Sequence, residues 1–581
     1  MDSNETIIVI EGLSYKPAGV DKVLLTDINL CVHKGDLVLL LGPSGCGKSI
    51  LTRCLDGLIP QIEGGDMKGS VIVAGKNTKK VPVYELSTNI GLIFQNPDDQ
   101  ILSLKVVDEV SWGVETQGQT HKVIVERVDK FMEMLGITHL KDRLTFAISG
   151  GEKQKVSIAS NLALLQDIMV LDDPTTDLDP VCKAEVVQVM DFLHRDMGKT
   201  LIVIEHDLDT LISLANRMVI MDHGHIVFDD SPAKILAEHY NDVISLGVNI
   251  PQHIEIVQAI LNYRVLEGEY PVQKEAAFKL LKEFVESHPA QGTMPKPVVP
   301  ESQKGKPIIT VQDLRVSYNP EKPVLKGLNF EIFEGEFVAI VGANGSGKST
   351  LVSTMIGLLH PDSGDILVDS CNTKETSVAD LAIKIGYVFQ NPDHQLFTNN
   401  VADEVGFSLK MHGVIGDEAI QRSKEVLDVV ELGDCLDRHP FSLSRGQRQK
   451  LAVATALVHR PKMILLDEPT TGQDGKSLSG LLQMMTRLRE QGHSIIMVTH
   501  NMDIVANYAT RVIVMHQGQI VADGRPEDVF YLQYDDLEAL RLRPPTVVEF
   551  CRLLEDKGMP RFLTIDGLLE YINSIGKVVD T

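Results

Sequence analysis

Two stretches with the same spacing decide the fold: GPSGCGKS at 42–49 and GANGSGKS at 342–349. Each matches G-x-x-x-x-G-K-S and follows a short apolar run, LVLLLG at 37–42 and EFVAIVG at 336–342. In such a loop, between a strand and a helix, successive backbone N–H groups point at a bound phosphate. The sequence therefore predicts a phosphate-binding loop in each half of the chain.

Every residue of the two loops is a candidate nucleotide ligand. We expect the lysines to contact the β- and γ-phosphates of ATP and the serine hydroxyls to ligate Mg²⁺. The predicted set is Gly42, Pro43, Ser44, Gly45, Cys46, Gly47, Lys48 and Ser49 in the first loop, and Gly342, Ala343, Asn344, Gly345, Ser346, Gly347, Lys348, Ser349 and Thr350 in the second.

The similarity between the two halves extends well beyond the loops. Four later positions recur at offsets of 295, 295, 295 and 294 residues: Gln95 with Gln390, Ser149 with Ser444, Asp172 with Asp467, and His206 with His500. Several motifs in a fixed order indicate one duplicated domain.

Within each repeat, short β-branched runs alternate with helical stretches. NIGLIF, DIMVLD and TLIVIE in the first half correspond to KIGYVF, KMILLD and SIIMVT in the second. Such runs are typical of buried parallel strands. We predict an α/β fold with two tandem P-loop domains, each followed by a small helical extension. The predicted segments are 1–242 and 308–537 for the domains, 243–286 and 538–581 for the extensions, and 287–307 for a Pro-rich linker.

Two of the recurring strands end in carboxylates. In DIMVLDDP and KMILLDEP we expect Asp172 and Asp467 to hold Mg²⁺. The following residue, Asp173 or Glu468, can polarise an attacking water. His206 and His500 end further strands, where each side chain can reach a γ-phosphate.

Composition excludes several classes of protein. A formal charge of −25 over 581 residues argues against broad nucleic-acid binding. The seven cysteines are scattered and form no CxxC pair, which favours a reducing cytosol over a disulfide framework or a zinc site. The N-terminal stretch lacks the pattern of a signal peptide, and no apolar run approaches the roughly 20 residues of a membrane span. If the protein acts at a membrane, we expect partner proteins to supply the membrane-spanning part.

The turns ISGGEKQKVSIA at 148–159 and LSRGQRQKLAVA at 443–454 complete a resemblance to ATP-binding-cassette (ABC) ATPases with two fused cassettes. The resemblance implies an intramolecular sandwich in which each P-loop faces the signature turn of the other cassette. It implies that Tyr15 and Tyr318 stack on adenine, and that Gln95 and Gln390 sense the γ-phosphate. The signature residues that it implies are Ser149, Gly150 and Gly151 in one turn and Ser444, Gly446 and Gln447 in the other.

Three departures from the family pattern fall on one of the two implied sites. Asp173 stands where the other cassette has Glu468, Arg445 replaces the first signature glycine, and Ile50 stands opposite Thr350. Our hypothesis is that the Lys348 site turns over ATP while the Lys48 site mainly binds it.

The branch of the family is indicated by FQNPDDQILSLKVVDEVSWG at 94–113 and FQNPDHQLFTNNVADEVGFS at 389–408. These are similar to the energy-coupling-factor transporters of cobalt and vitamins. That resemblance implies a transmembrane coupling protein, a small integral-membrane substrate-binding protein and a location on the cytoplasmic face of the membrane. It suggests that basic coupling helices meet the acidic residues Asp98, Asp99, Asp108, Glu109, Asp393, Asp403 and Glu404.

Other ABC classes remain open at this stage. Fused-cassette sugar importers share the ATPase mechanism. Soluble ribosome-acting ATPases usually have a long charged linker, whereas residues 246–307 are charge-balanced and end Pro-rich. DNA-repair and chromosome ATPases need coiled-coil or zinc insertions, which the sequence does not contain.

Overall fold

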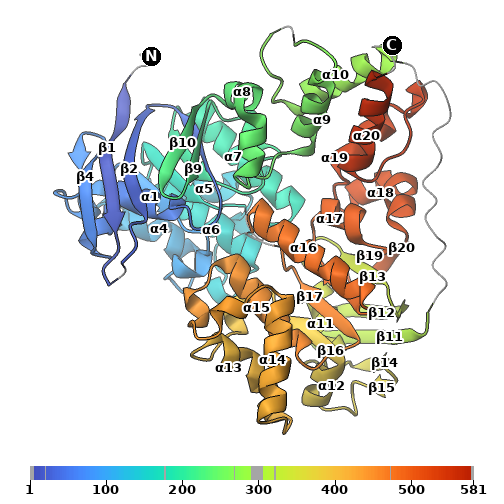
Figure 1. The fold of residues 1–581 in the computed structure, drawn as a ribbon. Coiled ribbons are helices and arrows are strands. Elements are labelled where there is room, and N and C mark those ends of the chain that lie inside the picture. The colour runs from blue at the N-terminus through green and yellow to red at the C-terminus, as the bar shows by residue number, and fades with distance from the viewer. Residues whose placement is uncertain are drawn as a thin grey trace. The chain divides into compact units, whose positions relative to one another are not determined.

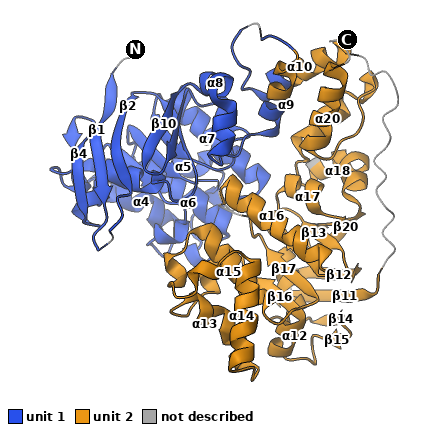
Figure 2. Cartoon of the chain, in the orientation of Figure 1, with its two compact units in different colours: residues 1–255, 264–277 blue, residues 256–263, 278–581 orange. Residues whose placement is uncertain are grey.

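The computed structural model describes residues 5–19, 21–175, 178–266, 268–288, 305–319, 322–470 and 473–577. It contains two compact units, one of residues 1–255 and 264–277, and one of residues 256–263 and 278–581 (Figure 2). Residues 289–304 of the predicted linker lie outside the described part of the chain.

Each repeat contains a four-stranded antiparallel sheet and a six-stranded, mainly parallel sheet (Figure 1). The small sheets have the orders β2-β1-β4-β5 and β12-β11-β14-β15. The large sheets have the orders β6-β7-β8-β3-β9-β10 and β16-β17-β18-β13-β19-β20, so the second repeat copies the first strand for strand. The predicted α/β class is confirmed.

The strands of the first repeat are β1 Thr6–Lys16, β2 Leu25–His33, β3 Leu37–Leu41, β4 Asp66–Val73, β5 Lys76–Asn77, β6 Ile90–Ile93, β7 Ile168–Asp172, β8 Thr200–Ile204, β9 Arg217–Asp222 and β10 His225–Asp230. Those of the second are β11 Pro307–Asn319, β12 Lys322–Phe333, β13 Phe337–Val341, β14 Ser363–Val368, β15 Cys371–Asn372, β16 Ile385–Val388, β17 Met463–Asp467, β18 Ser494–Val498, β19 Arg511–His516 and β20 Gln519–Gly524.

The helices of the first repeat are α1 Lys48–Leu55, α2 Leu58–Gln61, α3 Val83–Leu86, α4 Val106–Thr116, α5 His121–Met134, α6 Gly150–Ala163, α7 Pro180–Arg195 and α8 Pro232–Ser245, followed by α9 Gln252–Leu261 and α10 Lys274–Ser287. Those of the second are α11 Lys348–Met355, α12 Val378–Lys384, α13 Val401–Met411, α14 Asp417–Val429, α15 Arg445–Leu457, α16 Gly475–Glu490 and α17 Met502–Tyr508, followed by α18 Tyr534–Ala539, α19 Thr546–Leu553 and α20 Ile565–Gly576.

The central strands explain why the apolar runs form parallel sheets. Every residue of β3 is buried, and β3 pairs in parallel with β8 on one side and β9 on the other. In the second repeat β13 is equally buried between β18 and β19. Strands covered on both faces need apolar side chains at every position rather than at alternate ones. Each central strand delivers a phosphate-binding loop to its carboxyl end, where ligands bind in open α/β sheets.

Part of the first helical extension packs on the second extension, within the second compact unit. The Tyr263 hydroxyl donates to Asn573 Oδ1 over 3.1 Å, and the Phe278 and Phe550 rings lie 5.2 Å apart. A Cβ on Gly576 would lie 2.6 Å from the Tyr263 ring, so α20 needs a glycine there. Figure 1 shows α10 beside α20. The two extensions therefore share a hydrophobic contact, although they lie far apart in the sequence.

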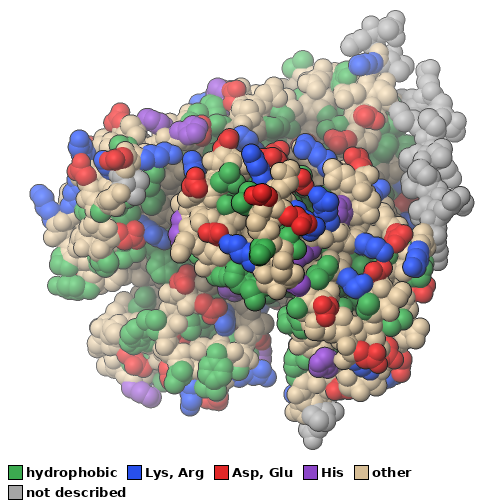
Figure 3. Space-filling view, turned by 60° about the horizontal axis from the view of Figure 1, so that its bottom comes forward, with side chains coloured by type: hydrophobic (Ala, Val, Ile, Leu, Met, Phe, Trp, Pro, Cys, Tyr) green, Lys and Arg blue, Asp and Glu red, His purple; other side chains and the backbone are tan. Residues whose placement is uncertain are grey.

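Among the described residues, no helix has the length and apolar composition that crossing a membrane requires. On the face drawn in Figure 3, the described Lys and Arg side chains are scattered among Asp, Glu and hydrophobic ones.

Candidate functional site

Both phosphate-binding loops have the same geometry at the start of a helix. Gly47 and Gly347 have φ values of 112° and 104° and directly precede α1 and α11. The Lys48 ammonium donates to Gly42 O over 2.7 Å and to Pro43 O over 3.1 Å, and Lys348 makes the same two bonds to Gly342 and Ala343. Each lysine thus lies folded over its own loop, with its charge where a phosphate would bind.

The first glycine of each loop is fixed by a close approach of the backbone. A Cβ on Gly42 would lie 2.1 Å from Met221 O, and one on Gly342 would lie 2.3 Å from Met515 O. Contacts this short against backbone cannot be relieved by rotating a side chain. The loop therefore packs on the last parallel strand only because these positions lack a side chain.

The oxygen donors expected around Mg²⁺ lie together in the first repeat. Asp172, at the end of β7, accepts a hydrogen bond from the Ser49 side chain. Burial raises the pKa of Asp172, and that hydrogen bond together with Lys48 lowers it. A buried carboxylate beside a hydroxyl is a hard oxygen set that suits Mg²⁺.

The second repeat holds an adjacent pair of buried carboxylates. Burial, followed by the charge of Glu468, raises the pKa of Asp467 to about 6. The Tyr387 hydroxyl donates to Asp467 Oδ2 over 3.4 Å. Two neighbouring buried carboxylates repel each other, and a bound cation would stabilise both in their charged form. Ser349 and Asp467 are therefore suitable ligands for Mg²⁺. Sequence reasoning missed Tyr387, whose counterpart in the first repeat is Leu92.

Glu468 and His500 lie close together just beyond the ends of the neighbouring strands β17 and β18. His500 Nδ1 lies 2.8 Å from Glu468 Oε2, and the carboxylate is buried. Burial opposes ionisation of Glu468, but His500 and Lys348 outweigh it and lower the pKa of the carboxyl below its usual value. An ionised carboxylate can accept a proton from water, which is the role proposed for Glu468.

The equivalent residues of the first repeat are arranged differently. Asp173 Oδ2 accepts from Gln95 Nε2 over 3.2 Å and lies 3.8 Å from His206 Nε2. Glu205, which sequence reasoning missed, is buried close by, and its carboxylate accepts from the Thr175 hydroxyl over 2.5 Å. Burial and the charge of Asp173 raise the pKa of Glu205 to about 7. The second repeat has Thr499 at this position, so the two sites differ by a whole buried carboxyl.

The two SxGx turns are helix caps. Ser149 precedes α6 and forms a reciprocal pair with Glu152, and Ser444 precedes α15 and forms the same pair with Gln447. This capping box explains why Glu can replace Gln at the fourth position, since both side chains accept from the serine N–H. A Cβ on Gly150 would meet nothing within 4 Å, so the fold of the second repeat readily accommodates Arg445 at the corresponding position.

The two tyrosines assigned to adenine are not equivalent, which corrects the prediction for Tyr15. Tyr15 pairs with Leu25 across the small sheet, and the residue that pairs with the equivalent Leu325 is Val316. Tyr15 is 2% exposed, and its hydroxyl donates to Gly64 O over 3.1 Å. Tyr318, by contrast, is 69% exposed. Only Tyr318 therefore offers a ring face to a nucleotide base.

Comparison with known proteins agrees with this geometry. A family described as ABC transporter matches residues 25–176 and 325–471. A putative ABC transporter ATP-binding protein of Methanosarcina mazei is 38% identical over 580 residues, which are 99% of this chain and 98% of the relative. The chain belongs to the ABC transporter family. As such it is a tandem ABC ATPase, which binds and hydrolyses ATP in support of transport.

Two further similarities were found. The putative HMP/thiamine import ATP-binding protein YkoD of Bacillus subtilis is 34% identical over 558 residues, 96% of this chain and 98% of the relative. The solved structure of CbiO1 from Clostridium perfringens is 35% identical, covers 42% of this chain and 97% of that chain, and has a TM-score of 0.37. Its title describes CbiO1 as part of the ABC transporter complex cbiONQ.

Most of the acidic residues after each sensing glutamine make contacts within their own cassette. Ion pairs inside each cassette engage three of them: Asp98 with Lys153 at 2.6 Å, Asp393 with Arg448 at 2.6 Å, and Asp403 with Lys410 at 3.2 Å. Their charges are therefore largely balanced within the chain, and only Asp99 and Asp108 of the predicted set remain exposed without an ion pair among the described residues.

Two more of these carboxylates, Glu109 and Glu404, are buried and hold a loop in place. Glu109 Oε2 accepts from the backbone N–H groups of Leu102 and Ser103 over 3.0 and 2.7 Å. Glu404 Oε2 accepts from Phe397 and Thr398 over 2.9 and 2.7 Å. The same clamp in both cassettes presents Leu102 in one and Phe397 in the other at the surface.

Proposed function

We propose that this chain is the ATP-hydrolysing energy-coupling subunit of an importer for a vitamin or a transition-metal ion. The observation that carries the proposal is the segment FQNPDxQ followed by a DEV helix, which occurs in both cassettes with the same internal clamp. YkoD, a relative over nearly its whole length, is named as an import ATP-binding protein, which supports the proposal.

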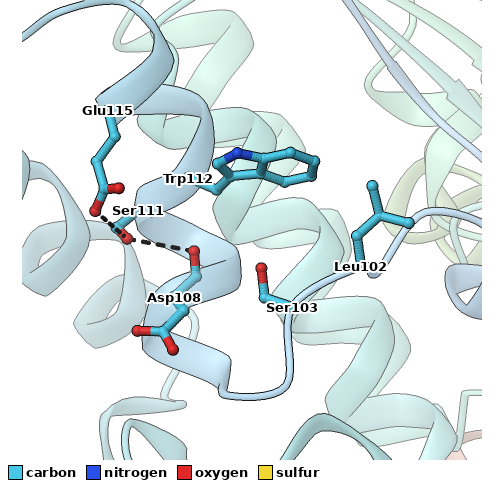
Figure 4. Close-up of a pocket in the computed structure, with 6 residues that line it drawn as sticks. All are labelled: Leu102, Ser103, Asp108, Ser111, Trp112 and Glu115. Atoms are coloured by element: carbon cyan, nitrogen blue, oxygen red, sulfur yellow. Dashed lines mark hydrogen bonds between the residues drawn. The ribbon is translucent and has the colours of Figure 1, made fainter.

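The partners we propose are a transmembrane coupling protein and a small integral-membrane substrate-binding protein. The chain would lie on the cytoplasmic face of the cell membrane as a peripheral subunit. The clamped loop of each cassette places a large apolar side chain, Leu102 or Phe397, next to a helix that also exposes an aromatic residue, Trp112 or Phe407; Figure 4 shows Leu102 and Trp112 in the first cassette. Exposed apolar groups gathered in this way are typical of protein interaction sites.

At the Lys348 site we assign roles to the chain's own side chains. Lys348 and the loop N–H groups bind the β- and γ-phosphates, and Ser349 and Asp467 would hold Mg²⁺. When bound, Mg²⁺ neutralises developing charge on the phosphate oxygens. Glu468 accepts the proton of the attacking water, while His500 and Gln390 orient the groups around the γ-phosphate.

At the Lys48 site we propose that ATP is mainly bound. Aspartate at position 173 is one methylene shorter than glutamate and already accepts a hydrogen bond from Gln95. The site also lacks an exposed adenine-stacking tyrosine, because Tyr15 is part of the core. The missing tyrosine is a fourth difference from the Lys348 site, in addition to the substitutions at Asp173, Arg445 and Ile50. We propose that closure of the two cassettes over ATP, and reopening after hydrolysis, drives the membrane partner.

The test is to solubilise native membranes gently, purify this chain and identify the proteins that accompany it. We expect a polytopic membrane protein together with a small integral-membrane binding protein, whose ligand names the substrate. Recovery with ribosomes from the soluble fraction, without a membrane protein, would overturn the transporter proposal. That result would not change the conclusion that the chain is an ATPase.

A further inference from the structure

One buried carboxylate joins two turns of the first cassette. Glu205 directly follows strand β8 and is 5% exposed. Its Oε2 atom accepts hydrogen bonds from the Thr175 N–H over 3.3 Å and from the Thr175 hydroxyl over 2.5 Å. Its Oε1 atom accepts from the N–H groups of His206 and Asp207 over 2.9 and 3.3 Å. Since Thr175 lies two residues after Asp173, Glu205 connects the turn after Asp173 to the turn that contains His206.

These contacts make Glu205 a positioning group and not a base. An ionised carboxylate has about four lone-pair sites, and the four hydrogen bonds use them, so the oxygens are not available to take a proton from water. Lys183 of α7 lies beside this carboxylate, with its ammonium 2.7 Å from Asp207 Oδ2. Burial lowers the pKa of Lys183, but the charges of Asp207 and Glu205 outweigh burial and raise it. A cation therefore supports the charge of the buried carboxylate.

The second cassette has no carboxylate at this position. Thr499 stands there instead, fully buried, and its hydroxyl accepts from the Asn501 N–H over 3.0 Å within the same turn. The lysine of α7 is also replaced, since Leu478 corresponds to Lys183 and Asn501 to Asp207. The group that joins the two turns of the first cassette, and the cation beside it, are thus absent at the corresponding positions of the second.

The two carboxylate–imidazole pairs differ as well. In the second cassette His500 Nδ1 lies 2.8 Å from Glu468 Oε2, so the two groups are in direct contact. In the first cassette His206 Nε2 lies 3.8 Å from Asp173 Oδ2. Burial, and after it the charge of Asp173, raises the pKa of Glu205, which means that the two buried carboxylates repel each other. A longer carboxylate at position 173 would meet this repulsion.

We propose that Glu205 is a positioning residue that limits hydrolysis at the Lys48 site. Because it joins the two turns itself, it holds His206 away from the carboxylate at position 173 and prevents the contact that Glu468 makes with His500. This inference rests on the proposal that the Lys48 site mainly binds ATP. The short side chain at position 173 is then only part of the cause, and positions 173 and 205 must change together before the site hydrolyses ATP.

The test is a gain of activity, which damage to the fold cannot produce. ATP hydrolysis by the full-length chain is measured at about pH 8, where Glu205, with its pKa of about 7, is ionised. All variants carry Glu468→Gln, which removes turnover at the Lys348 site. We expect Asp173→Glu alone, and Glu205→Thr alone, to change the remaining rate by less than about twofold. The two together should raise it about tenfold, a fraction of what a positioned base supplies.

Thr175 provides a matched pair of controls. In the chain that carries Asp173→Glu and Glu468→Gln, Thr175→Val removes the hydroxyl that donates to Glu205 and should also raise the rate. Thr175→Ser keeps that hydroxyl and should not raise the rate. Nucleotide binding at both sites is measured in each variant as the control for folding.

The outcomes separate the inference from the proposal on which it rests. An equal increase from either single change overturns the inference, because positions 173 and 205 then do not act together. The absence of an increase in the paired variant also overturns it. If Glu468→Gln alone keeps wild-type turnover, the assignment of turnover to the Lys348 site fails, and the inference fails with it.

Discussion

Replacing Tyr318 by alanine should weaken nucleotide binding at one of the two sites. Stacking of a base on an aromatic side chain contributes roughly 1–3 kcal/mol. The Tyr318 hydroxyl lies 3.4 Å from Thr350 Oγ1, which holds one edge of the side chain, and the residue is 69% exposed. We therefore expect the lower half of that range, about 1–2 kcal/mol, or about five- to thirtyfold in the dissociation constant.

The assay is equilibrium binding of a fluorescent ATP analogue under conditions that resolve two sites per chain. Tyr318→Ala should weaken one class of site and leave the other unchanged, whereas Tyr318→Phe should bind like the wild type. Tyr15→Phe is the matched control, because it removes only the buried bond to Gly64 and should lower stability by about 1 kcal/mol without affecting either class. The correction of Tyr15 is refuted if Tyr15→Phe weakens nucleotide binding, or if Tyr318→Ala does not.

Three further changes test other parts of the structure. Burial raises the pKa of Asp56 to about 7. Between about pH 4 and 7 the folded chain therefore binds a proton that the unfolded chain does not, and the free energy of unfolding falls as pH rises through that window. Asp56→Asn should therefore be more stable by on the order of 2 kcal/mol above pH 7 and equal near pH 4, as measured by urea unfolding; no pH dependence of the difference would contradict this. Glu404→Gln should cost roughly 1.5–3 kcal/mol and speed hydrogen exchange at the Phe397 and Thr398 amides, while unchanged exchange would rule out the clamp. Gly342→Ala should abolish nucleotide binding at one site in the same two-site assay, and full occupancy of both would show that the backbone can yield.

The sequence was sufficient to predict the phosphate-binding loops and the parallel strands. A glycine-rich turn and an apolar run each impose a local backbone geometry. Residues 42–49 and the run before them therefore predict a strand followed by a phosphate-binding loop without information from the rest of the chain. The carboxylate of Glu468 and the ring of His500 then come together because both end neighbouring strands of one sheet.

Tyr15 could not be placed from its motif alone. The loop after β1 is longer than its counterpart after β11: Leu25 follows Tyr15 by ten positions, whereas Leu325 follows Tyr318 by seven. The two tyrosines look equivalent in sequence, but their backbone partners differ. Only the strand register, which joins Tyr15 to Leu25 and Val316 to Leu325, separates them. Tyr318 lies two residues beyond Val316, the register counterpart of Tyr15, near the end of β11, where its side chain is exposed instead of packed in the core.

The contacts of the acidic residues after each glutamine could not be predicted from that stretch alone. The partners that neutralise or bury these carboxylates lie far away in the chain, as Lys153 does for Asp98, or are backbone amides, as for Glu109. Neither kind of partner leaves a pattern in the acidic segment itself. Glu205 has no counterpart in the second repeat, where Thr499 stands, so the similarity between the two halves gives no signal for it.

The unequal chemistry of the two ATP sites is tested most directly by paired substitutions. ATP hydrolysis is measured in Glu468→Gln and in Asp173→Asn, in the complex purified from membranes, with nucleotide binding as the control for folding. Loss of a general base costs roughly a hundredfold to ten-thousandfold in rate. We expect Glu468→Gln to remove nearly all turnover and Asp173→Asn to change it by less than about twofold. Equal losses from the two substitutions would contradict a single dominant catalytic site.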